Sequence, residues 1–107
     1  MQSIETQTMS ATTDNLHKKV LELTVKNHPG VMSHVCGLFS RRAYNMDGIL
    51  CMPVADGKMS RIWLRVDSNG QLEQIVKQLQ KLEDVQGIRY HGAEHDVFVR
   101  LEDYFKV

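Results

Sequence analysis

The segment Asn27-His28-Pro29-Gly30-Val31 contains the residues of this chain best suited to bind a small anion. It joins a strand-like run, 19–26, to a helix-like run, 32–43. Proline suits the first helical position because its missing N–H would lack a partner there, and Gly30 beside it leaves the first-turn amides open. These amides lie at the positive end of the helix dipole, where a carboxylate is stabilised without a catalytic residue. The alternative is a plain strand-to-helix turn.

The histidines, cysteines and carboxylates form no recognisable catalytic or metal-binding set in the sequence. His91 and His95 have a spacing that two helical metal ligands can share, but Gly92 lies between them and no further ligand pair completes a tetrahedron. His34 and Cys36 are two positions apart, so on a helix they point in different directions. Adjacent carboxylates at 83–84 and 102–103 are expected to be solvated. We therefore expect neither a catalytic residue nor a metal site.

The composition indicates one compact domain with no preference for polyanions. The chain has 107 residues, 42% of them hydrophobic, which is enough for one core and too few for two. Thirteen basic and thirteen acidic side chains give a net charge of +0 and a pI near 7.0, which argues against nucleic-acid binding. Residues 1–17 lack a leader pattern and no window reaches membrane-span length, so we expect a cytoplasmic protein whose two cysteines stay as thiols.

Hydrophobic periodicity predicts the first half of the domain. Residues 1–17 are rich in Ser, Thr and Gln and are expected to form a disordered tail. Alternation over 19–26 places Leu21, Leu23 and Val25 on one face of a strand. Apolar residues at spacings of three and four then predict a helix over 32–43 that ends near Tyr44. The mostly apolar run 46–54 predicts a second strand.

The second half of the domain is predicted to form a hairpin, a helix and a last strand. Asp56-Gly57 is a hairpin signal that leads into a third strand over 59–66. Trp63 falls on the polar face of that strand, where it either covers the sheet or anchors an interface. Leu72, Ile75, Val76, Leu79 and Leu82 mark an amphipathic helix, and 85–90 forms a fourth strand. Pro53 cannot donate to a ladder, so the second strand should lie at the edge of the sheet.

The predicted order is strand, helix, strand, strand, helix, strand. This βαββαβ order is the ferredoxin-like α+β fold, a four-stranded antiparallel sheet in the order 4-1-3-2 with both helices on one face. We assign the domain to residues 18–92. Residues 93–107 form an extension whose periodicity allows a strand, a short helix or one of each.

With the loop at 27–31 placed after the first strand of this order, the chain resembles the ACT family of amino-acid-sensing domains. The stretches LELTVKNHPGVMSHVCGLFSRRAYNMDGILCMPV and LEQIVKQLQKLEDV are similar to the small regulatory subunit of acetohydroxyacid synthase, in its short single-domain form. The resemblance implies a non-catalytic subunit whose effector binds at a dimer interface. We predict that this homodimer pairs through the second strand, because a two-fold contact there would cover the exposed edge of the sheet. The resemblance further implies a large catalytic partner that carries thiamine diphosphate, FAD and magnesium, with no cofactor in this chain.

The resemblance also implies an effector site for valine or a related branched-chain amino acid at the dimer interface, giving feedback inhibition. Its positions in this sequence are Asn27, Gly30, Val31, Met32, Asn45, Met46 and Ile49. The Asn27 amide can serve both ends of an amino acid, and the backbone at Gly30 and Val31 receives its carboxylate. The alternative function is a stand-alone ferredoxin-like interaction or RNA-binding module, although the aromatic residues are scattered and no basic face is present.

Overall fold

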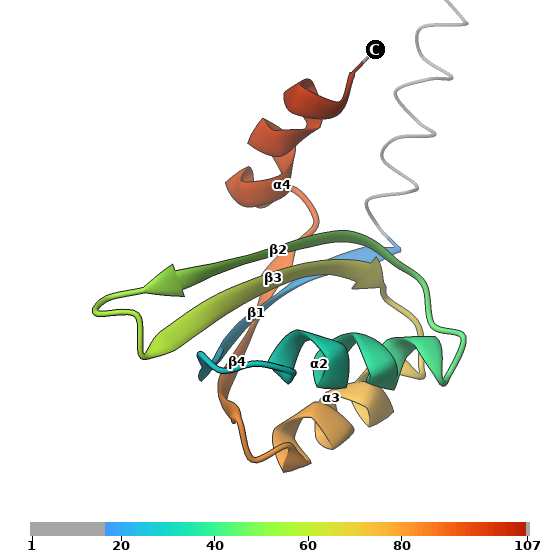
Figure 1. The fold of residues 1–107 in the computed structure, drawn as a ribbon. Coiled ribbons are helices and arrows are strands. Elements are labelled where there is room, and N and C mark those ends of the chain that lie inside the picture. Colours follow the sequence, from blue (N-terminus) through green and yellow to red (C-terminus); the bar gives the residue numbers. More distant parts are fainter. Residues whose placement is uncertain (1–16, 107) are drawn as a thin grey trace, which may run out of the picture.

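The computed structural model describes residues 17–106 (Figure 1). Its elements follow the chain as β1 (Lys18–Lys26), α2 (Val31–Ser40), β2 (Met46–Val54), β3 (Met59–Asp67), α3 (Leu72–Lys81), β4 (Val85–Gly92), α4 (Asp96–Leu101) and the 3-10 helix η1 (Glu102–Phe105). The tail expected over residues 1–17 lies outside the described residues except for His17. No helix in the described part of the chain is long and apolar enough to cross a membrane.

The four strands form one antiparallel sheet in the order β2-β3-β1-β4. This is the predicted order 4-1-3-2 read from the other edge, and it confirms the ferredoxin-like fold. The strand that contains Pro53 lies at the edge, as the missing amide hydrogen requires. Near its start β2 has a bulge between Met46 and Gly48, which places Asp47 out of register with β3.

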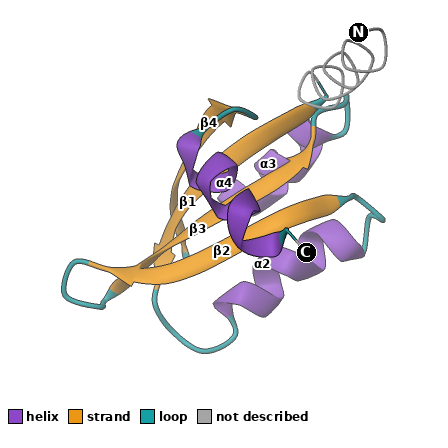
Figure 2. Ribbon diagram, turned by 90° about the horizontal axis from the view of Figure 1, so that it is seen from above, coloured by secondary structure: helices purple, strands orange, loops and turns teal. Residues whose placement is uncertain are grey.

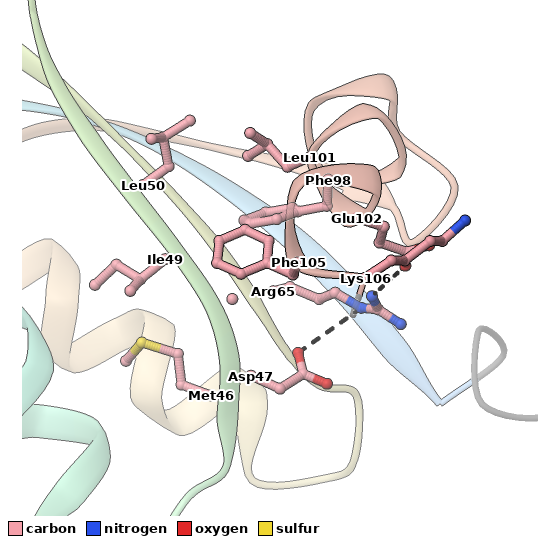
Figure 3. Close-up of a pocket in the computed structure, with 11 residues that line it drawn as sticks. Met46, Asp47, Ile49, Leu50, Arg65, Phe98, Leu101, Glu102, Phe105 and Lys106 are labelled. Carbon is pink, nitrogen blue, oxygen red and sulfur yellow. Dashed lines mark hydrogen bonds and ion pairs between the residues drawn. The ribbon is translucent and has the colours of Figure 1, made fainter.

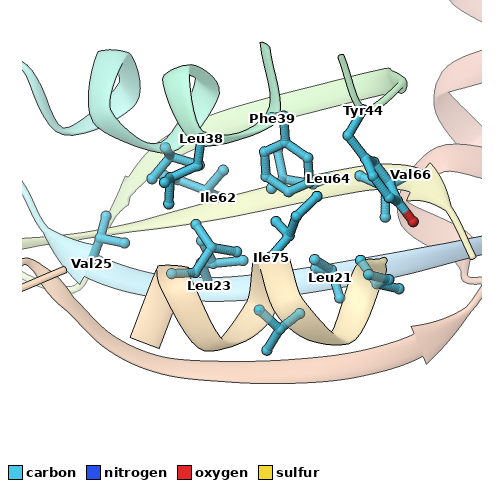
Figure 4. Close-up of a cluster of buried hydrophobic side chains, with 14 of the residues drawn as sticks. Leu21, Leu23, Val25, Leu38, Phe39, Tyr44, Ile62, Leu64, Val66 and Ile75 are labelled. Carbon is cyan, nitrogen blue, oxygen red and sulfur yellow. The ribbon is translucent and has the colours of Figure 1, made fainter. Parts of the chain in front are cut away.

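The hydrophobic core lies between the sheet and the two helices α2 and α3 (Figure 4). Side chains that alternate along β1 and β3 are fully buried there, as the period of two predicts. They meet the helix stripes, which consist of Val31, Val35, Leu38 and Phe39 on α2 and of Leu72, Ile75, Val76 and Leu79 on α3. Both helices therefore cover the same face of the sheet (Figure 1).

Helix α2 ends at Ser40, three residues before the predicted end at Ala43. Ala43 has a left-handed conformation with φ of 51°, which stops the helix, and the Tyr44 N–H donates to the Phe39 carbonyl at 2.9 Å. The Tyr44 ring then packs edge-on against Phe39 at 5.9 Å between ring centroids. This is a Schellman-type ending with its hydrophobic contact, made here without the usual glycine.

The extension after β4 is helical and packs on the face of the sheet that α2 and α3 leave open (Figures 1 and 2). Helix α4 and η1 lie above β2 and β3, and Phe98 of α4 is buried against Gly48. A Cβ atom at position 48 would lie 2.8 Å from Cε1 of Phe98. The missing side chain of Gly48 therefore makes room for this helix.

Candidate functional site

The loop between β1 and α2 is fixed to the hairpin that joins β2 to β3. The backbone N–H of Asn27 donates to the Lys58 carbonyl at 3.0 Å. Its side-chain Nδ2 donates to the Gly57 carbonyl at 2.6 Å. Asn27 is thus held by two hydrogen bonds to the turn, and neither of them uses its side-chain oxygen.

Gly30 caps the N-terminus of α2 with φ of 90° and ψ of −13°, in the left-handed region that favours glycine. The expectation that Pro29 occupies the first helical position was wrong, because the helix begins at Val31 and Pro29 lies in the preceding turn. Within the described part of the chain no side chain caps this helix, and a Cβ on Gly30 would have no neighbour within 4 Å. The helix terminus is therefore open to a ligand.

The amides of the first turn of α2 have few partners. The Val31 N–H donates a long hydrogen bond to the His28 carbonyl at 3.4 Å, and the first regular helical bond runs from the His34 N–H to the Gly30 carbonyl at 3.0 Å. The first N–H groups of a helix lack intrahelical acceptors, so those of Val31 and Met32 are suited to receive an anion. The Val31 side chain is buried and Met32 packs partly against the core, which fixes the turn in place.

His28 joins this loop to the turn between α3 and β4. Its Nε2 lies 2.6 Å from Oδ1 of Asp84, and its Nδ1 lies 2.8 Å from the Pro29 carbonyl oxygen. The Asp84 carboxylate, and then the Pro29 carbonyl, raise the pKa of His28 above its ordinary value. A positive charge is thereby favoured next to the open helix terminus.

The remaining predicted site residues lie at the other end of the sheet. Asn45 is exposed just before β2, Met46 packs against the core, and Ile49 is 43% exposed on the edge strand. The pairings Lys26 with Met59 and Met59 with Val54 place the loop beside the far end of β2. A nine-residue strand spans about 27 Å, so one protomer does not bring the two groups of residues together.

A cavity of about 720 Å³ lies between β2 and the segment formed by α4 and η1 (Figure 3). Its lining is mostly apolar, with an ion-paired Arg65 whose partners are Asp47 at 3.7 Å and Glu102 at 3.2 Å. Met46 and Ile49 of the predicted site belong to the lining of this cavity, although in Figure 3 their side chains lie on the other side of the β2 ribbon from Phe98. No pattern in the sequence predicted the cavity, although a glycine inside a strand, here Gly48, indicates a close approach of another segment.

His91, His95 and Trp63 stack together on the open face of the sheet. The Trp63 ring centroid lies 5.3 Å from that of His91 and 4.8 Å from that of His95. His91 Nε2 also lies 2.9 Å from Oε1 of Glu22, and His95 Nδ1 accepts the Val97 N–H at 3.2 Å and caps α4. Trp63 therefore covers the sheet. Across residues 17–106 there is no group of three or more side chains that could hold a metal ion.

Taken together, the fold and the open helix terminus define an ACT-type domain. Residues 21–87 match the family model "AHAS small subunit-like ACT domain", in which AHAS denotes acetohydroxyacid synthase. The chain is 47% identical over 97 residues to the acetolactate synthase isozyme 1 small subunit of Escherichia coli K12, covering 91% of this chain and 98% of that protein. The chain therefore belongs to the family of acetolactate (acetohydroxyacid) synthase small subunits, and this confirms the predicted family.

Longer relatives match over only part of their length. The Haemophilus influenzae acetolactate synthase small subunit is 32% identical over 108 residues, covering 83% of this chain and 66% of that protein. The fold is similar to the crystal structure of the acetolactate synthase small subunit from Thermotoga maritima, with a TM-score of 0.61 and 24% identity. That match covers 82% of this chain and 67% of the other. The chain thus corresponds to the small-subunit type and not to a catalytic chain.

Proposed function

We propose that this protein is a regulatory subunit that binds a branched-chain amino acid, valine first among them, between two copies of the chain. In this proposal the subunit activates a catalytic acetolactate synthase subunit when the two associate. Ligand binding biases the arrangement that the catalytic subunit contacts and inhibits that subunit when valine accumulates. The observation that carries the proposal is the open N-terminus of α2 at Gly30, next to an asparagine that is already fixed in place.

The loop supplies groups for both charged ends of a free amino acid. The first-turn amides of Val31 and Met32 suit the carboxylate, since they lie at the positive end of the α2 dipole. The Nδ2 of Asn27 donates to the Gly57 carbonyl, so its Oδ1 is available to accept from the ammonium group of the ligand. A formally neutral protein surface suits a zwitterion, which carries no net charge. What one protomer lacks is an apolar wall for the side chain of the ligand.

A second copy can supply that wall through the edge strand. β2 exposes Ile49 and Met52 at 43% and 60%, and an unpaired edge favours pairing with another strand. An antiparallel two-fold contact centred on Leu50 would reverse the strand and set Met46 of the second copy opposite Val54. Val54 lies beside the hairpin that holds Asn27, so Asn45 and Met46 of the second copy would lie near the loop of the first, and Ile49 of the second copy would lie opposite Cys51. This arrangement accounts for the separation of the two groups in a single protomer.

The catalytic chemistry in this proposal belongs to the partner. We expect the large subunit to carry thiamine diphosphate, FAD and magnesium, while this chain contributes ligand sensing alone. The coupling is then a difference in the affinity of the small-subunit dimer for the catalytic subunit, or in the activity that it supports, with and without valine.

The test combines co-purification with activity and calorimetry. A tagged copy of this protein is expected to retain the acetolactate synthase catalytic subunit and to raise its activity, and valine should lower that activity. Sedimentation should give a dimer, and titration with valine should give saturable heat with one or two sites per dimer. A monomer that gives no heat of binding with valine, leucine or isoleucine would overturn the ligand-binding part of the proposal. Failure to co-purify with the catalytic subunit would overturn the assignment of that subunit as the partner.

A further inference from the structure

The two ring nitrogens of His28 both face oxygen acceptors. Nε2 is 2.6 Å from the Asp84 carboxylate and Nδ1 is 2.8 Å from the Pro29 carbonyl oxygen. A neutral imidazole has a single N–H and satisfies one acceptor only, whereas the imidazolium ion donates to both. The geometry is therefore that of a doubly protonated ring bridging two segments that are distant in sequence, the β1–α2 loop and the α3–β4 turn.

The charges around His28 favour this state. Asp84 has a side chain only 18% exposed and is the main cause that raises the pKa of His28, followed by the Pro29 carbonyl. Lys26 at the end of β1 opposes the shift, and partial desolvation does so as well. On the neighbouring hairpin, Lys58 lies 3.8 Å from Asp56, so these two charges largely offset one another. The backbone N–H of Lys26 also donates to the Asp84 carbonyl at 2.9 Å, which holds the carboxylate beside the loop.

We propose that the His28 imidazolium acts as a tether that positions the β1–α2 loop for the carboxylate of the effector, so that effector binding weakens when the ring loses its proton. The proposal rests on the proposed function for its ligand, and on the His28–Asp84 contact for its mechanism. His28 is a positioning residue in this account and does not itself contact the ligand. Losing the proton removes one of the two hydrogen bonds and a positive charge near the amides of Val31 and Met32.

The direction of the pH effect follows from the sign of the pKa shift. Because the folded pKa of His28 is raised, the stabilising contribution is complete below the ordinary histidine value of about 6.5 and is lost as pH rises through the folded pKa. Since the ring is partly exposed, we expect a modest change in affinity, about two- to fivefold between pH 6 and pH 8.5.

The tether is tested by comparing Asp84→Asn with Glu83→Gln. Both remove one negative charge by an isosteric amide from the same turn, but only Asp84 contacts His28. NMR titration of the His28 ring should give a lower pKa in Asp84→Asn than in wild type and an unchanged pKa in Glu83→Gln. Equal pKa shifts in the two variants would overturn the tether, because any charge on this turn would then act on His28 in the same way. No pKa shift in Asp84→Asn would overturn it too, because Asp84 would then have no effect on the ring.

The link to the ligand is tested by calorimetry with valine over the same pH range. Wild type and Glu83→Gln should bind more weakly as pH rises, and Asp84→Asn should bind weakly with little pH dependence. Wild-type affinity that does not change with pH would overturn the coupling even if the tether is present. Absence of heat from wild type at every pH would overturn the proposed function instead, and the NMR titration would still decide whether the tether exists.

Discussion

Replacing Gly30 by aspartate or by asparagine separates the charge requirement of the site from its backbone requirement. Gly30 has φ of 90°, and both substitutes cost about 1–2 kcal/mol in this left-handed region. A Cβ at this position would meet nothing within 4 Å, so the first side-chain atom of either substitute has space. Asparagine and aspartate adopt the left-handed conformation more readily than other non-glycine residues, which keeps the strain similar in the two variants. The two variants therefore differ by one negative charge in otherwise matched structures.

That charge would lie near the position proposed for the ligand carboxylate. At a separation of about 5 Å, two unit charges repel by about 3 kcal/mol with an effective dielectric constant of about 20, and by about 0.8 kcal/mol in bulk water. The exposed loop lies between these limits. The expected loss of affinity of Gly30→Asp relative to Gly30→Asn is therefore about four- to 150-fold.

Isothermal titration with valine measures this difference, and urea unfolding checks that the two variants are equally stable. We expect Gly30→Asn to retain measurable binding and Gly30→Asp to lose most or all of it. Raising the salt concentration should narrow the gap, because exposed charges are screened. Equal affinities in the two variants at low salt would refute the placement of the carboxylate at the N-terminus of α2.

Three further predictions concern the fold around the site. Ala43→Gly should raise the free energy of unfolding by about 0.5–1 kcal/mol in urea, because Ala43 is left-handed with φ of 51°; no gain would contradict this account of the helix end. Gly48→Val should displace Phe98 and cost about 1–3 kcal/mol, visible as faster proteolysis of α4, and an unchanged cleavage rate would count against the packing. His95→Ala should remove the cap on Val97 and speed amide exchange within α4 alone; exchange that rises throughout the sheet would argue otherwise.

The sheet and the two core helices follow from patterns that are local in the sequence. Alternation placed Leu21, Leu23 and Val25 in the core, and all three are fully buried. Pro53 placed its strand at the edge, because a residue without an amide hydrogen is tolerated there. These features depend on a period or on one missing donor, so a single chain segment is enough to predict them.

Other features of the fold depend on contacts between segments that are distant in the sequence, and a local sequence pattern does not predict such contacts. The end of α2 was misplaced because Ala43 has a conformation that glycine usually adopts, so the sequence lacked the expected signal. The secondary structure of the extension could not be predicted, because the docking of α4 depends on the space above Gly48 and on contact of His95 with Trp63. The sequence is compatible with two roles for Trp63, covering the sheet or anchoring an interface, and the contact with His95 distinguishes them.

The candidate site also has one part that a local sequence pattern predicts and one part that depends on distant contacts. The loop is local, and its expected opening at Gly30 is present in the structure. Asn45 and Met46 lie at the other end of the sheet from that loop in one chain, so the proposed site with Ile49 would require a second copy. A property that arises only on association does not follow from the geometry of one chain.

The central claim is that the first turn of α2 receives the carboxylate of a free amino acid. Titrating the isotope-labelled protein with valine while recording amide NMR spectra tests it most directly. We predict saturable shift changes that are largest at Gly30, Val31 and Met32, with a second group at Met46–Ile49. Shift changes confined to residues that line the cavity, such as Phe98 and Leu101, with none at Gly30, Val31 and Met32, or no change at millimolar valine, would contradict the account.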